Sequence, residues 1–186
     1  GSQSSSWQTD LKTNGLISTK NDPKLTYQHF GDEFFLDKNQ AQNLQDLFLT
    51  MVVENLPNIR NINVLGGEPT MSPSFWKFVD TLSDHDVSNL TLSIISNGSN
   101  AVNIEKFVQY RDKFADIGII LSIDGTEKKA EFFRGGLQWD KFQESVDYVL
   151  NKTDLNLTLL GTISALSIDG LIENLDWYAK LKEKFQ

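Results

Sequence analysis

Apolar and polar residues alternate in blocks along the chain from about residue 36 onward. Short apolar runs, which are typical of buried strands, are separated by longer stretches in which apolar residues recur at helical spacing. The longer stretches predict helices with apolar faces within residues 44–56, 75–82, 104–114, 139–150 and 171–178. The short runs predict strands over residues 61–65, 90–95, 117–123 and 155–163. Strands that alternate with helices favour an α/β fold with a parallel sheet and right-handed crossovers.

Several residues predict where these helices begin and end. Pro57 is expected to stop the first helix, because proline has no amide proton for the helical hydrogen bond. Ser72 or Ser74 is expected to cap the second helix, Asn103 the third and Asp169 the last. The capping residues therefore predict three helix starts.

The first 35 residues do not follow this alternation. They contain the turn signal Asp22-Pro23 and an aromatic cluster that includes Tyr27 and Phe34. The predicted organisation is an irregular segment over residues 1–35, followed by an α/β core over residues 36–186.

Glycine and polar residues gather where the predicted strands end. The four ends read Gly66-Gly67-Glu68-Pro69, Ser96-Asn97-Gly98, Ser122-Ile123-Asp124-Gly125 and Gly161-Thr162-Ile163-Ser164-Ala165-Leu166. Parallel α/β sheets bind their ligands at the carboxyl ends of the strands. A binding site is therefore expected at this edge of the sheet, with Ser96 among its contacts.

The first of these ends, Gly66-Gly67-Glu68-Pro69, has a chemistry of its own. Two glycines and a proline form a tight turn that exposes backbone carbonyls beside one carboxylate. Such a turn suits a positively charged amine, whereas a phosphate requires free N–H groups and a following lysine.

Composition narrows the choice of partners. The net charge of −8 disfavours nucleic acid, which normally binds to a basic surface. The longest apolar stretch, over residues 117–121, is too short for a membrane span. No cleavable signal peptide is visible, so a cytoplasmic location is expected. The chain contains no cysteine, which excludes disulfides and thiolate metal sites within these residues.

In chain order, the strand ends resemble those of the radical S-adenosylmethionine (SAM) enzymes, in particular the branch with a twitch domain. Gly66-Gly67-Glu68-Pro69 is similar to the family's turn for the SAM ammonium group. The resemblance implies a partial parallel (β/α) barrel that lacks the first and last strands. It also implies SAM as the cofactor and a peptide or protein as the substrate.

The resemblance assigns each remaining site residue to one part of SAM. Ser122 and Asp124 resemble the ribose contacts, and Arg134 resembles the arginine that meets the carboxylate. Ile163 and Leu166 lie in a segment similar to the one against adenine. None of these residues is expected to act as a general acid or base, because such a site positions a cofactor that supplies the chemistry.

The sequence departs from the family in one respect. Radical SAM enzymes hold a [4Fe–4S] cluster with three cysteines in a C-x3-C-x2-C loop, and this chain has no cysteine. The chain is therefore interpreted as a core fragment. With a cluster held elsewhere in a full-length protein, it would generate a 5′-deoxyadenosyl radical for hydrogen abstraction.

Two other interpretations stay open at this point, and with them the question of whether the chain is itself an enzyme. One is a pseudoenzyme that has lost the cluster and serves as a SAM-binding or protein-interaction module. The other is an unrelated α/β barrel enzyme whose strand-end glycines bind a different small molecule.

Overall fold

The computed structural model describes residues 38–165 and 167–185, and the chain divides into two compact units after Pro57. In the first unit, helix α2 spans Lys38–Asn55, and a 3₁₀ turn, η3, follows over Leu56–Asn58 and ends at the first residue of the second unit. The predicted helix is confirmed, and it ends two residues before Pro57. The segment predicted as irregular, residues 1–35, lies outside the described residues.

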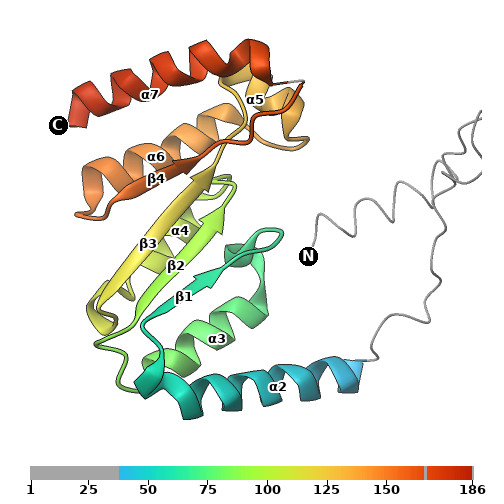
Figure 1. Cartoon of the computed structure of the whole chain (residues 1–186), viewed down its shortest axis with the longest axis vertical. Coiled ribbons are helices and arrows are strands. Elements are labelled where there is room, and N and C mark those ends of the chain that lie inside the picture. Colours follow the sequence, from blue (N-terminus) through green and yellow to red (C-terminus); the bar gives the residue numbers. More distant parts are fainter. Residues whose placement is uncertain (1–37, 166, 186) are drawn as a thin grey trace, which may run out of the picture. The chain divides into compact units, whose positions relative to one another are not determined.

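The second unit is built on four parallel strands, shown in Figure 1. They are β1 (Asn61–Val64), β2 (Thr91–Ser96), β3 (Asp116–Ser122) and β4 (Leu157–Leu160). The strands lie in the order β1-β2-β3-β4. The predicted parallel α/β fold is thus confirmed, and the described strands form an open sheet.

Helices and 3₁₀ turns connect the strands, and one further turn and helix follow β4. The helices are α3 (Pro73–Ser83), α4 (Ala101–Val108), α5 (Glu127–Phe133), α6 (Trp139–Lys152) and α7 (Leu171–Phe185). The turns are η4 (Pro69–Met71), η5 (Arg111–Lys113) and η6 (Ile168–Gly170). Within residues 38–165 and 167–185, no helix has both the length and the apolar character that a bilayer span needs.

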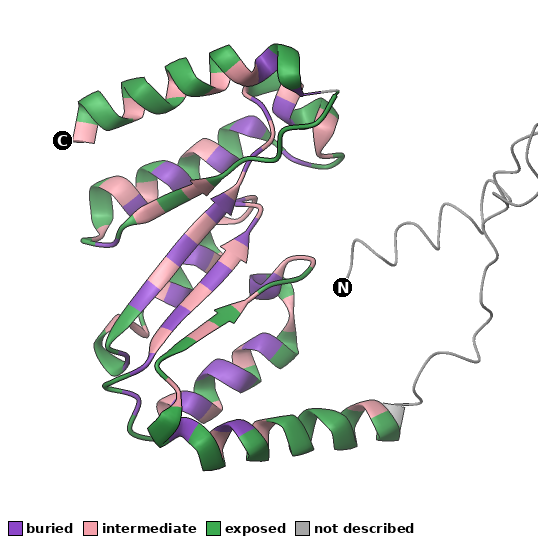
Figure 2. Ribbon diagram, in the orientation of Figure 1, coloured by how far each residue is buried: buried purple, intermediate pink, exposed green. Residues whose placement is uncertain are grey.

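The two faces of the sheet differ in burial. Residues of β2 and β3 alternate between buried and half-buried, as Figure 2 shows by colour. Leu92, Ile94 and Leu121 have no exposed surface. Since the strand order never reverses, right-handed crossovers place every connecting helix on one face of the sheet. The buried residues therefore belong to the helix-covered face.

The opposite face carries small and polar residues beside the half-buried Ile95 and Ile120, which pair in register. Asn63, Ser93 and Gly118 lie side by side in register on β1, β2 and β3. A Cβ atom at Gly118 would lie only 2.3 Å from the Ser93 hydroxyl oxygen, so a larger residue there would require the Ser93 side chain to move.

The predicted helix starts are only partly right. Ser72 is the N-cap of α3, with Pro73 at the first helical position. Helix α4 begins at Asn100 instead of Asn103, because the Asn100 side chain accepts a hydrogen bond from the Asn103 amide at 3.2 Å. Asp169 lies within the turn η6 that leads into α7 and does not cap that helix.

Candidate functional site

Glu68 joins the ends of β1 and β2. Its carboxylate Oε1 accepts hydrogen bonds from the hydroxyls of Thr70 at 2.8 Å and Ser96 at 2.9 Å. Its Oε2 accepts one from the Asn97 amide at 2.8 Å. A carboxylate with three donors from its own chain is held in one orientation, since moving it would leave buried donors unsatisfied. Glu68 thus anchors the turn to the neighbouring strand.

The turn before Glu68 leaves two backbone carbonyls available. Gly66 has a φ of +124°, a backbone conformation that side chains other than glycine rarely adopt. Across residues 38–165 and 167–185, no hydrogen bond is formed by the carbonyl of Gly66 or Gly67. Pro69 is buried and opens η4, which sets the direction of the chain after the turn. The carbonyls are the groups at this turn that remain free to accept hydrogen bonds from an amine.

A second cluster forms at the ends of β3 and α5. Arg134 Nε donates to Asp124 Oδ2 at 2.8 Å, and Arg134 Nη2 donates to the Ser122 hydroxyl at 2.5 Å. The Arg134 and Asp124 side chains are 21% and 18% exposed, so the pair is largely shielded from water but not fully buried. The structure thus brings together three residues that the sequence assigned to one cofactor.

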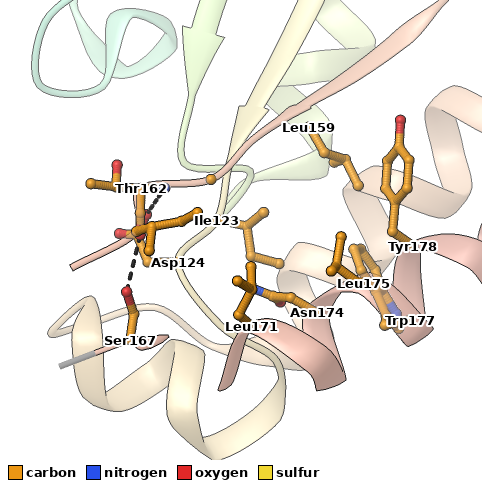
Figure 3. A pocket seen from close by; sticks show the side chains of 12 residues that line it. Ile123, Asp124, Leu159, Thr162, Ser167, Leu171, Asn174, Leu175, Trp177 and Tyr178 are labelled. Atoms are coloured by element: carbon orange, nitrogen blue, oxygen red, sulfur yellow. Dashed lines mark hydrogen bonds between the residues drawn. The ribbon is translucent and has the colours of Figure 1, made fainter. Parts of the chain in front are cut away.

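Asp124 also connects β3 with the loop after β4. Its Oδ1 accepts a hydrogen bond from the Thr162 amide at 3.0 Å. The Thr162 carbonyl in turn accepts a hydrogen bond from the buried Ser167 hydroxyl at 3.1 Å, and both contacts are drawn in Figure 3. The Asp124 carboxylate therefore serves two partners, one with each oxygen.

Ile163 lines a cavity of about 240 Å³ beside this cluster. Asp124, Thr162 and Leu159 also line it, and Figure 3 shows the side chains of α7 on its other side. The residues from α7 are mostly apolar: Leu171, Asn174, Leu175, Trp177 and Tyr178. The cavity is therefore suited to an apolar ring. Leu166, the other predicted adenine contact, lies outside the described residues.

The predicted site residues thus fall into two groups at one edge of the sheet. Glu68 and Ser96 belong to the first group, and Ser122, Asp124 and Arg134 belong to the second. The groups lie on neighbouring strands, since Ser96 is in register with Leu121, the residue before Ser122. Ser96 is only 3% exposed and its hydroxyl donates a hydrogen bond to Glu68, so it positions that carboxylate.

Sequence reasoning missed three residues of these groups. Thr70 and Asn97 hold Glu68, and Thr162 holds Asp124. Each of them lies within or directly after a strand-end segment that the sequence singled out. Two of the three contribute a backbone amide, a group that every residue type except proline carries, so residue identity alone gave no signal.

The site contains no evident metal centre. Within the part of the chain that the structure describes, no group of three or more histidine, cysteine, aspartate or glutamate residues is placed to hold a metal ion. The geometry instead offers one arginine, two backbone carbonyls and an apolar cavity.

Comparison with known proteins does not assign the chain to a family. No family model matches this chain. No curated protein matches it either. The assignment of a function therefore relies on the site itself.

Proposed function

We propose that this chain binds S-adenosylmethionine at the carboxyl edge of its sheet, as the core of a radical SAM protein. The observation that carries the proposal is the cluster of Arg134 with Ser122 and Asp124. It lies at the same edge as the turn at Gly66 and Gly67, whose carbonyls are free. SAM carries a carboxylate, an ammonium group, a ribose and an adenine, and this edge offers a partner for the carboxylate and for the ammonium group.

The residues present fit SAM by their donors and acceptors. Arg134 uses Nε and one proton of Nη2 internally, which leaves its remaining donors for a carboxylate. The free carbonyls of Gly66 and Gly67 accept hydrogen bonds from the ammonium group, and Glu68 adds a negative charge nearby. The cavity lined by Ile163 receives the adenine ring.

The proposal includes a barrel. A strand order without reversal, with the helices between the strands on one face, is the arrangement of a (β/α) barrel wall. The helix-free face, with Asn63, Ser93 and Gly118, would then line the barrel interior, where a substrate meets the cofactor. By the resemblance, that substrate is a peptide or protein.

The iron–sulfur cluster does not fit these residues, because the sequence contains no cysteine. SAM supplies hydrogen-abstraction chemistry only beside such a cluster, so no chemical step is assigned to this chain. Its residues bind and orient the cofactor. A non-catalytic SAM-binding module is the second candidate function, and the lack of cysteine favours it. The gene sequence upstream of the codon for Gly1 separates the two, since a C-x3-C-x2-C motif there supports the enzyme.

Titration calorimetry with SAM tests the proposal. Arg134→Ala is expected to weaken binding by about 1–3 kcal/mol, because it removes a charged hydrogen-bond partner of the carboxylate. Arg111→Ala is a matched control, since Arg111 lies in η5 before the amino end of β3 and pairs there with Asp116. Equal affinities in wild type and Arg134→Ala, or no SAM binding by the wild type, would contradict the proposal.

A further inference from the structure

The geometry points to Asp124 as a positioning residue that aims Arg134 at a ligand carboxylate, and not as a ribose contact. This inference rests on the proposed function, since it concerns how the same site recognises SAM. It begins from the hydrogen bonds that the Asp124 carboxylate forms within the chain, one with each oxygen.

Asp124 and Ser122 occupy one edge of the Arg134 guanidinium. A guanidinium has five N–H donors in a planar fork, and Nε with one proton of Nη2 forms one of its bidentate edges. Asp124 accepts from Nε and Ser122 accepts from Nη2. No described residue accepts a hydrogen bond from Nη1. The edge formed by Nη1 and the second proton of Nη2 is therefore the one presented to a ligand.

Both oxygens of Asp124 have a partner. Oδ2 accepts from Arg134, and Oδ1 accepts from the Thr162 amide. A carboxylate oxygen can accept more than one hydrogen bond, but a ribose contact would have to share an oxygen with a charged donor or a backbone amide. The bonds within the chain account for the residue without a ribose.

The arrangement has a consequence for ligand choice. An arginine fixed at Nε loses little conformational freedom when a carboxylate binds to its other edge, so positioning lowers the entropy cost of that contact. The site is thereby specific for adenosyl ligands that keep the α-carboxylate. A ligand without the carboxylate gains nothing from Arg134 or from Asp124.

Two ligands that differ only in this group test the inference. SAM and decarboxylated SAM share adenine, ribose, sulfonium and amine, and only SAM has the carboxylate. For Asp124→Ala we expect an affinity for SAM about tenfold lower and an affinity for decarboxylated SAM within about twofold of wild type. The ratio of the two affinities is independent of how much of the variant is folded. Asp116→Ala, at the amino end of β3, is the matched control and should change neither affinity.

The double variant with Arg134→Ala completes the test. If Asp124 acts through Arg134, then Asp124→Ala and Arg134→Ala together should weaken SAM binding no further than Arg134→Ala alone. An equal loss for both ligands in Asp124→Ala would identify a ribose contact and overturn the inference, while the proposed function stands. Tighter SAM binding by Asp124→Ala would also overturn it, since the carboxylate would then act on the ligand by repulsion. A wild type that binds neither ligand would overturn the proposed function and the inference together.

Discussion

The two ends of strand β3 carry the same pair of residue types in different surroundings. At the amino end, Arg111 Nη2 lies 3.6 Å from Asp116 Oδ1, and the side chains are 35% and 53% exposed. At the carboxyl end, Arg134 Nε lies 2.8 Å from Asp124 Oδ2, and the side chains are 21% and 18% exposed. The amino-end distance is that of a charge contact in water, whereas the carboxyl-end distance is that of a charge-assisted hydrogen bond.

The pairs also differ in what they connect. Arg111 and Asp116 are five residues apart, and Asp116 otherwise accepts a hydrogen bond from the amide of its neighbour Ile117. The carboxyl-end pair joins α5 to β3 and, through the Thr162 amide, to the loop after β4. An ion pair between nearby exposed residues contributes little, whereas a shielded pair that joins several elements contributes through each of them. Both pairs consist of an arginine and an aspartate. The pair at the candidate site therefore differs from the other in its burial and in the number of elements that it joins, and not in its residue types.

The largest loss of stability is expected on substitution of Glu68, the other residue that connects elements at the carboxyl edge of the sheet. Glu68→Ala leaves the Thr70 and Ser96 hydroxyls and the Asn97 amide without their acceptor, and Thr70 and Ser96 are buried. We expect the free energy of unfolding in urea to fall by about 1–3 kcal/mol.

Asp86 provides the control for Glu68 at the opposite edge of the sheet, where β2 begins. In the loop before β2, it accepts hydrogen bonds from the hydroxyl and the amide of Ser88, which lower the pKa of its carboxyl. Its contribution to stability is present above the ordinary pKa of about 3.8 and is lost as the pH falls through the lowered value. Asp86→Ala is expected to destabilise less than Glu68→Ala at pH 7. If Asp86→Ala lowered the free energy of unfolding as much as Glu68→Ala or more, the expected difference in stability between the two edges of the sheet would be contradicted.

Double-mutant cycles compare the two arginine–aspartate pairs directly. For Arg134 and Asp124 we expect a coupling free energy of about 1.5 kcal/mol, as for a shielded charged hydrogen bond. For Arg111 and Asp116 we expect about 0.5 kcal/mol or less, because an exposed pair is screened. The measurement is urea unfolding of the four proteins of each cycle, repeated in 1 M NaCl. Salt should remove the amino-end coupling and leave most of the other. Equal couplings at both ends would show that burial does not separate the pairs.

The smallest loss of stability is expected on removal of the hydrogen bond between Tyr110 and Asp80, which lies away from both ends of β3. The Tyr110 hydroxyl donates a hydrogen bond to Asp80 of α3, and this bond, with burial and the charge of Asp80, raises the pKa of Tyr110 to about 12. Because the folded pKa lies above the unfolded value of about 10, the contribution to stability is full below pH 10 and is lost between pH 10 and about 12.

Tyr110→Phe tests this contact. Since Tyr110 is only half-buried, we expect the free energy of unfolding to fall by less than about 1 kcal/mol at pH 7. The difference between wild type and variant should shrink when urea unfolding is repeated above pH 10. A loss at pH 7 as large as that of Glu68→Ala would contradict the ranking by burial and connectivity.

The order of the main elements could be predicted from the sequence because it depends on local periodicity. The four strands and the helices α3, α4, α6 and α7 occur where the apolar pattern indicates them, with boundaries that differ by a few residues. The helix α5 was missed, since its seven residues, Glu-Lys-Lys-Ala-Glu-Phe-Phe, bury only Ala130 and carry no helical stripe. The start of α4 was misplaced because Asn100 and Asn103 are equally good caps, and only the backbone decides between them.

The sequence by itself determined that polar and glycine-rich segments follow successive strands, and parallel strands must bring those segments to one edge. What each side chain does there was decided by the tertiary structure. The Ser96 hydroxyl donates a hydrogen bond to Glu68. One carboxylate oxygen of Asp124 accepts from Arg134, and the other accepts from the Thr162 amide. The physical reason is that periodicity reports which face of an element is buried, whereas a hydrogen bond depends on the distance between groups far apart in the chain. Asp124 and Thr162 are 38 residues apart in sequence, and only the pairing of β3 with β4 places them in contact.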